Sequence, residues 1–209
     1  RVLCTFGGGS IDKNGSRKDV EEALQELQCE VKWEGGICPN PQYDRLVEIT
    51  AVIKEYKPDI LISVGGGSGC DATKFLALAA KLENDADAWD DIIIKHKFPS
   101  SAIPIGAVMT LPATGSEWNN GFVISRRETG WKIPGGFATT YPYFSLIDPR
   151  YTMTLPLRQL RNGVFDAFTH CIDQFLSPIE APMFDNFWMS LMKELVTIGP
   201  EVIKEGSSL

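Results

Sequence analysis

The chain has 209 residues, which is enough for one large domain or for one ordinary domain with part of a second. Hydrophobic residues make up 44% of the chain and charged residues 22%, a balance that is typical of globular proteins and excludes a disordered tail. The net charge of -7 excludes a broad surface for nucleic acid or anionic membranes.

Five cysteines without a CxxC pair indicate neither a disulfide framework nor a zinc knuckle, and they favour a reducing cytoplasm. No apolar run approaches the roughly 20 residues that a membrane span needs. The chain opens on a strand-like run without an initiator Met or a signal core, so we expect that an upstream segment is missing.

In chain order, the apolar pattern predicts alternating strands and helices. Val2–Phe6 is a β-prone run that leads into the glycine turn Gly7–Ser10, and an amphipathic helix capped by Ser16 follows. A short strand over Cys29–Trp33 and a second amphipathic helix over Tyr43–Tyr56 come next.

The order of strand, glycine turn and helix then repeats. Asp59–Val64 has the continuous apolar character of a buried parallel strand, and it ends in Gly65–Ser68 before a helix over Asp71–Leu82. The acidic stretch Leu82–Asp91 lacks the pattern of a calcium loop, so we expect a solvated linker there. Further strands are expected over Ala102–Thr110, Gly121–Arg126 and Phe144–Ile147. This order predicts an α/β fold with a Rossmann-like parallel sheet.

The character of the chain changes near residue 156. Arg158–Leu176 and Asp185–Ile198 have helical patterns with no strand between them. We therefore predict an α/β domain over residues 1–155 and the beginning of an all-helical domain over residues 156–209.

Two glycine turns, each between a predicted strand and a helix, are the first candidate binding elements. Small residues there allow backbone N–H groups to approach a phosphate, and two such turns suggest a dinucleotide. The alternative is that each is only a tight connection. Asp71 and Lys74 follow the second turn, where Asp71 would also suit the helix dipole and Lys74 would also suit a solvated surface.

The segment after the third apolar run carries hydroxyl groups. Thr110, Thr114 and Ser116 precede Glu117 at the expected carboxyl edge of the sheet, where hydroxyls can hold a ribose, a phosphate or an amide. The alternative is that Ser116 or Thr114 caps a helix.

Asp166 and His170 lie one helical turn apart, a spacing at which two side chains can hold one divalent cation. Two ligands are fewer than a metal site needs, and His96 lies in a Lys-rich stretch that is typical of a surface. A helix-stabilising hydrogen bond is the alternative for this pair.

An ordered set of motifs resembles one family, the iron-containing (group III) alcohol dehydrogenases, and most closely its branch of NADPH-dependent aldehyde reductases and butanol dehydrogenases. The motifs are Gly7–Ser10, Gly65–Lys74, Thr110–Glu117, Ile147–Pro149, Thr154–Pro156 and Asn162–His170. The resemblance implies a dehydroquinate synthase-like architecture, with residues 1–155 as a dinucleotide-binding domain that lacks its first strands. Residues 156–209 would begin a truncated helical metal-binding domain.

The resemblance also implies a role for individual residues. Asp166 and His170 would be two metal ligands, and further histidine ligands would lie beyond the end of this chain. The implied cofactor-binding residues are Gly8, Gly9, Ser10, Gly66, Gly67, Ser68, Asp71, Thr110, Ser116, Lys132, Thr154 and Leu155.

The resemblance further implies reversible, metal-assisted hydride transfer between NADPH and an aldehyde, giving a primary alcohol. The glycines of Gly7–Ser10 resemble those of NADP-preferring members. Lys13 could pair with a 2′-phosphate, whereas the neighbouring Asp12 would repel it, and NAD is the alternative coenzyme. Fe²⁺ is the expected ion and Zn²⁺ the alternative. We expect a cytoplasmic homodimer, and we expect that this fragment alone is inactive. Alternatives are a polyol dehydrogenase, a dehydroquinate-synthase-like enzyme or a non-catalytic dinucleotide-binding fragment.

Overall fold

The computed structural model describes residues 1–83 and 86–204. The chain divides into two compact units, Arg1–Met153 and a second unit that begins at Thr154. Asp85 in the acidic stretch and residues 205–209 of the predicted helical domain lie outside the described residues. Among the helices of the described ranges, none has the length and hydropathy of a membrane span.

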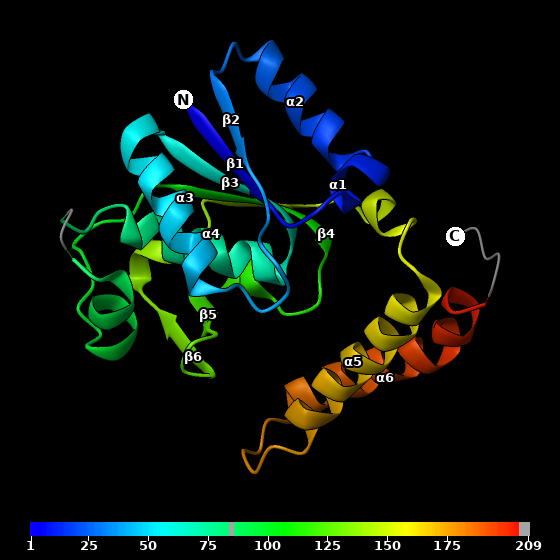
Figure 1. Cartoon of the computed structure of the whole chain (residues 1–209). Helices are drawn as coiled ribbons and strands as arrows, with labels where there is room; N and C mark the ends of the chain where they lie inside the picture. Colours follow the sequence, from blue (N-terminus) through cyan, green and yellow to red (C-terminus); the bar gives the residue numbers. More distant parts are fainter. Residues whose placement is uncertain (84–85, 205–209) are drawn as a thin grey trace. The chain divides into compact units, whose positions relative to one another are not determined.

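The first unit is built on a five-stranded sheet with the strand order β2-β1-β3-β4-β7 (Figure 1). All four pairings are parallel, so the carboxyl ends of the strands lie at one edge. The predicted α/β class with a Rossmann-like parallel sheet is therefore confirmed. The strands are β1 (Val2–Phe6), β2 (Val31–Glu34), β3 (Ile60–Gly66), β4 (Ile105–Leu111) and β7 (Phe144–Ile147).

Helices cover both faces of this sheet (Figure 1). Because side chains alternate along a strand, Val2 and Cys4 of β1 pack with the first two helices, whereas Leu3 packs on the other face with the next two. Each face buries its own apolar cluster. The helices are α1 (Ser10–Lys13), α2 (Ser16–Glu26), α3 (Tyr43–Tyr56) and α4 (Gly67–Ala79).

A hairpin of β5 (Gly121–Arg126) and β6 (Trp131–Gly136) forms a separate antiparallel sheet between β4 and β7 in the chain. Phe122 packs edge-on against Phe75 of α4, with 6.0 Å between the ring centroids. α4 is therefore enclosed by the sheet and by β5 and is buried along most of its length. The sequence did not predict β6, because Pro134 and two glycines interrupt its β pattern.

Short helical segments complete the first unit. They are the π-helix η1 (Trp89–Ile94) and the 3-10 helices η2 (Ser116–Trp118), η3 (Ala138–Thr140) and η4 (Pro149–Thr152). The expected solvated linker is wrong for the part that leads into η1. Asp87 accepts a hydrogen bond of 2.8 Å from the Tyr43 hydroxyl, and Trp89 is buried, so this part packs against the core.

The second unit contains α5 (Leu157–Phe175) and α6 (Pro182–Val202), which pack against each other. α6 begins earlier than the apolar pattern predicts, because Pro182 occupies a first-turn position that suits its fixed φ and missing N–H. The predicted domain boundary at residues 155 and 156 lies near Thr154, where the second unit begins, and it stays a prediction.

Two local predictions about helix starts are wrong. Ser16 does not cap α2: the N-cap is Gly15, whose φ of 82° suits glycine, and the Ser16 hydroxyl donates instead to Asn14 Oδ1 at 2.7 Å. α4 begins at Gly67 rather than at Asp71, because the glycine turn itself forms the first helical turn. The backbone N–H groups of Gly67 and Ser68 are therefore among the unpaired donors of the helix N-terminus.

Candidate functional site

The strand order creates a switch point between β1 and β3. In the strand order, the connection from β1 leads outward to β2, whereas the connection from β3 leads in the opposite direction to β4. In open α/β sheets, ligands bind outside the carboxyl ends of the strands at such a point. The Gly7–Ser10 turn follows β1, and Gly66–Ser68 join β3 to α4, so both predicted glycine turns lie at the switch point.

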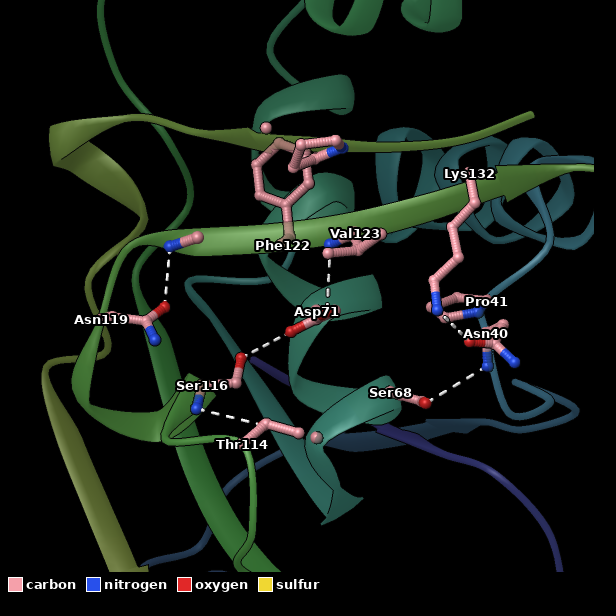
Figure 2. Close-up of a pocket in the computed structure, with 14 residues that line it drawn as sticks. Asn40, Pro41, Ser68, Asp71, Thr114, Ser116, Asn119, Phe122, Val123 and Lys132 are labelled. Carbon is pink, nitrogen blue, oxygen red and sulfur yellow. Dashed lines mark hydrogen bonds between the residues drawn. The ribbon is translucent and has the colours of Figure 1, made fainter. Parts of the chain in front are cut away.

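A pocket of about 350 Å³ opens beside the second glycine turn (Figure 2). Its lining comes from α4, from the loop after β4, from the β5–β6 hairpin and from the loop before α3. Five predicted site residues lie together in this lining: Gly67, Ser68, Asp71, Ser116 and Lys132. The other lining residues are Asn40, Pro41, Thr114, Asn119, Gly121, Phe122, Val123, Pro134 and Gly135.

Asp71 connects α4 to the hairpin across this pocket (Figure 2). Its Oδ1 accepts a hydrogen bond of 2.6 Å from the Ser116 hydroxyl, and its Oδ2 accepts one of 2.9 Å from the Val123 N–H. Burial raises the pKa of Asp71, and these two hydrogen bonds oppose that rise by favouring the carboxylate. Asp71 is the fifth residue of α4 and lies outside its first turn, so the alternative of a helix-dipole role is wrong, and its hydrogen bonds join α4 to the walls of the pocket.

Lys74 is fully buried behind the pocket, so the alternative of a solvated surface cation is wrong. Its Nζ lies within hydrogen-bond distance of four oxygens: Ser116 O at 2.5 Å, Ser116 Oγ at 2.9 Å, Asn119 Oδ1 at 3.1 Å and Gly121 O at 2.7 Å. Ser116 therefore bridges Asp71 and Lys74. The alternative of a helix-capping Ser116 is also wrong, because Gly115 is the N-cap of η2.

Close approach at the start of α4 requires glycine. A Cβ on Gly67 would lie 2.5 Å from Thr114 Oγ1, closer than real side chains allow, and 3.1 Å from Thr114 Cγ2, so Thr114 would have to shift. Thr114 Oγ1 in turn accepts a hydrogen bond of 3.3 Å from the Ser116 N–H. Gly67 and Ser68 both line the pocket at the N-terminus of α4, which is the position that a phosphate site requires.

Asn40, Asn119 and Val123 belong to the site and were not predicted. The Asn40 N–H donates to Ser68 Oγ at 3.3 Å, and Lys132 Nζ donates to Asn40 Oδ1 at 2.7 Å, which joins the hairpin to the glycine turn (Figure 2). Asn40 has a φ of 55°, a left-handed conformation that asparagine tolerates. Its place between two prolines was the available signal.

The remaining predicted cofactor residues do not line this pocket. Gly8, Gly9 and Ser10 lie at the carboxyl end of β1, and a Cβ on Gly8 would meet no atom within 4 Å. Thr110 lies in β4 and is buried. Thr154 and Leu155 belong to the second unit, and their expected role stays a prediction.

The two predicted metal ligands lie on α5 with exposed side chains. His170 Nε2 is 3.6 Å from Asp166 Oδ2, so the two donor atoms face one another across one helical turn. Within residues 1–83 and 86–204, no group of three or more His, Cys, Asp or Glu side chains could hold a metal ion. A carboxylate and an imidazole suit iron or zinc as two of several ligands, so the pair fits part of a metal site.

A parallel sheet with glycine turns and a polar pocket at its switch point is the arrangement of doubly wound α/β proteins, which bind their ligands at that point. The profile of the family "Iron-containing alcohol dehydrogenase" matches residues 1–149. The chain therefore belongs to the iron-containing alcohol dehydrogenase family, which confirms the resemblance found in the sequence.

Relatives with known names include both coenzyme types. The chain is 45% identical over 206 residues to the NADPH-dependent aldehyde reductase YqhD of Escherichia coli K12, an alignment that covers 98% of the chain and 53% of that protein. It is 38% identical over 205 residues to a probable NADH-dependent butanol dehydrogenase of Bacillus subtilis, with coverage of 98% and 52%.

The crystal structure of E. coli K-12 YqhD superposes with a TM-score of 0.90 at 44% identity. The superposition covers 100% of this chain and 53% of that one. The chain thus spans about half the length of the relatives that it matches.

Proposed function

We propose that this chain carries the coenzyme-binding part of an oxidoreductase that transfers hydride between NADPH and an aldehyde, giving a primary alcohol. The observation that carries the proposal is the pocket of Figure 2, where Gly67, Ser68, Asp71, Ser116 and Lys132 converge beside the switch point. Membership of the iron-containing alcohol dehydrogenase family supports the reaction class.

The strand neighbours suggest how the coenzyme would lie. Gly66, Gly67 and Ser68 would hold the pyrophosphate, since they combine open backbone with the N-terminus of a 13-residue helix. The end of β4 lies on one side of this turn and the end of β1 on the other. The nicotinamide and its ribose would therefore lie toward Thr110, Ser116 and Lys132, and the adenosine toward Gly8, Gly9 and Ser10.

This chain's residues would bind and orient the coenzyme rather than react with it. Asp71 and Lys74 fix Ser116, and Asn40 fixes the Lys132 ammonium at one wall of the pocket. Bound, the reduced nicotinamide would supply a hydride to the carbonyl carbon, a divalent ion would act as Lewis acid on the carbonyl oxygen, and solvent would supply the proton. Thr154 and Leu155 would lie near the nicotinamide, as the family resemblance implies.

Asp166 and His170 would provide two ligands of that ion. Their 3.6 Å donor separation and their one-turn spacing support this role. Fe²⁺ is the proposed ion because of the family, and Zn²⁺ is the alternative because its preferred ligands include the same groups.

Preference for NADPH over NADH is the finer part of the proposal. The glycines of the first turn leave room for a 2′-phosphate, and relatives of both preferences are known. We also propose a cytoplasmic homodimer. The described cysteines are all unpaired, which suits a reducing compartment, and light scattering on the purified protein would test the dimer.

A titration of the chain with NADPH and NADH tests coenzyme binding. Trp118 lies beside the pocket loop and Trp131 precedes Lys132, and both are exposed, so we expect saturable quenching of their fluorescence. Lys132→Met should weaken NADPH binding, and Lys95→Met, at an exposed lysine of equal charge outside the pocket, should not. A natively folded chain that binds neither coenzyme would refute the proposal.

The catalytic part is tested in a protein that contains this chain and has the length of its relatives. NADPH consumption with butanal should stop after treatment with EDTA and return with Fe²⁺ or Zn²⁺. Turnover that persists unchanged in EDTA would refute the metal-dependent reaction, while coenzyme binding without any turnover would favour a non-catalytic dinucleotide-binding protein.

A further inference from the structure

The end of β1 is where the proposed coenzyme would present either a 2′-hydroxyl or a 2′-phosphate, and this inference rests on the proposed function. In doubly wound sheets, the strand next to the one with the phosphate turn carries the residue that reads the adenosine ribose at its carboxyl end. Here the phosphate turn follows β3, and β1 is its neighbour on the side away from β4. The charged groups around the first glycine turn, which follows β1, should therefore determine the preference between NADPH and NADH.

One carboxylate lies directly beside that turn. Asp12 Oδ2 is 3.8 Å from the position that a Cβ on Gly9 would occupy. The other oxygen of the same group, Asp12 Oδ1, is 3.6 Å from Arg17 Nη1. The Asp12 carboxylate thus lies between the open turn and a guanidinium group, and about half of its surface is exposed to solvent.

Arg17 is held in place from two other directions. Its guanidinium carbon lies 4.8 Å from the ring centre of Trp33 and 5.5 Å from that of Phe6, and its Nε donates to Glu21 Oε1 at 3.0 Å. Stacking on two aromatic rings restricts the side chain and partly removes it from water. Arg17 therefore offers Asp12 a fixed positive partner rather than a mobile one.

We propose that the Asp12–Arg17 pair determines how well this protein accepts a 2′-phosphate, with Arg17 acting through Asp12. An unpaired Asp12 carboxylate would accept a hydrogen bond from a ribose 2′-hydroxyl and would repel a 2′-phosphate dianion. Arg17 offsets part of the negative charge of that carboxylate and so reduces its repulsion of a phosphate at the turn. Lys13, at the end of α1, adds a positive charge next to Asp12 in the chain.

The two partners must then shift the coenzyme preference in opposite directions. Removing the Asp12 charge should raise the ratio of NADPH to NADH affinity by about threefold to tenfold, as expected for one charge near a phosphate in a solvent-exposed site. Removing the Arg17 charge should lower the same ratio by a similar factor, because Asp12 would then face the phosphate unpaired.

The test measures the dissociation constants of NADPH and NADH by tryptophan fluorescence for the 209-residue chain and its variants at fixed salt. The variants are Asp12→Asn, Arg17→Met and the double variant. Glu22→Gln and Lys18→Met are the matched controls: each makes the same change of charge on the exposed pair that joins Lys18 to Glu22, and each should leave the ratio within about twofold. Because NADH is the reference within each variant, a general loss of folding cancels from the ratio.

The outcomes separate the two proposals. If the unaltered chain binds neither coenzyme, the proposed function fails and this inference with it. If both coenzymes bind and Asp12→Asn leaves the ratio unchanged, the inference is wrong and the proposed function stands. If Arg17→Met lowers the ratio equally with and without Asp12, Arg17 acts on the phosphate directly and the proposed pair is refuted. Asp12→Asn alone remains a complete test if Arg17→Met does not fold.

Discussion

Replacement of Lys74 by Met tests whether the buried ammonium holds the pocket together. The substitution keeps the length and apolar stem of the side chain but removes the ammonium that faces four oxygens, which belong to Ser116, Asn119 and Gly121. The substitution leaves the buried carbonyl and hydroxyl oxygens of Ser116 without this donor, and each buried acceptor that loses its donor costs about 1–3 kcal/mol, so we expect a loss of about 2–5 kcal/mol. The total free energy of unfolding of such a domain is about 5–15 kcal/mol, so this loss should be a large fraction of it.

Urea unfolding followed by tryptophan fluorescence measures this loss. With a slope of about 2 kcal/mol per molar urea, the midpoint should fall by about 2 M. Lys18→Met is the control, because Lys18 is exposed and its pair with Glu22 should contribute less than about 1 kcal/mol. A loss below about 1 kcal/mol for Lys74→Met would refute the reasoning, since water or a rearranged loop would then satisfy the same oxygens.

Three further predictions concern other parts of the chain. Burial raises the pKa of Tyr43 and of Tyr151 from 10.0 to about 12, so between these values the folded state keeps protons that the unfolded chain releases. The urea midpoint should therefore fall as the pH rises from about 10 to 12. Tyr151→Phe should reduce the fall of the midpoint with pH. Gly67→Ala should weaken NADPH binding at least tenfold by displacing Thr114, and the double variant Gly67→Ala, Thr114→Ala should restore most of the lost affinity. If Gly67→Ala binds NADPH as tightly as the unaltered chain, Thr114 shifts at no cost and the reasoning is wrong. In a protein of the relatives' length, His170→Ala should abolish retained metal and turnover while the dissociation constant of NADPH changes less than twofold; lost NADPH affinity with metal retained would exclude the ligand role.

The helices and buried strands were predictable because their signals are local. In α3, Leu46, Ile49 and Ile53 recur at helical spacing and are all buried, and both predicted ends agree with the structure. β3 likewise has the continuous apolar run that burial on both faces requires. The glycine turns could be found for the same reason, since each turn lies directly between its strand and its helix.

The interior of the site could not be predicted, because its contacts join distant parts of the chain. Lys74 has no sequence neighbour that marks it as buried; its partners lie 42 to 47 residues further along the chain. Asn40 joins Lys132 across 92 residues, and a single asparagine in a proline loop carries no indication of that distance. Local pattern thus located the walls of the pocket, whereas the network that fixes them depends on tertiary structure.

The β5–β6 hairpin has a consequence for how this fold diversifies. Its two strands pair with each other and not with the five-stranded sheet, although one of them supplies Lys132 to the pocket. Its attachment includes the Asp71–Val123 hydrogen bond and the packing of Phe122 on α4. β5 is tied to the core by Phe122 and Ile124, whereas β6, which is more exposed, supplies Lys132. Substitutions in β6 could therefore change one wall of the pocket without changing the register of the five-stranded sheet.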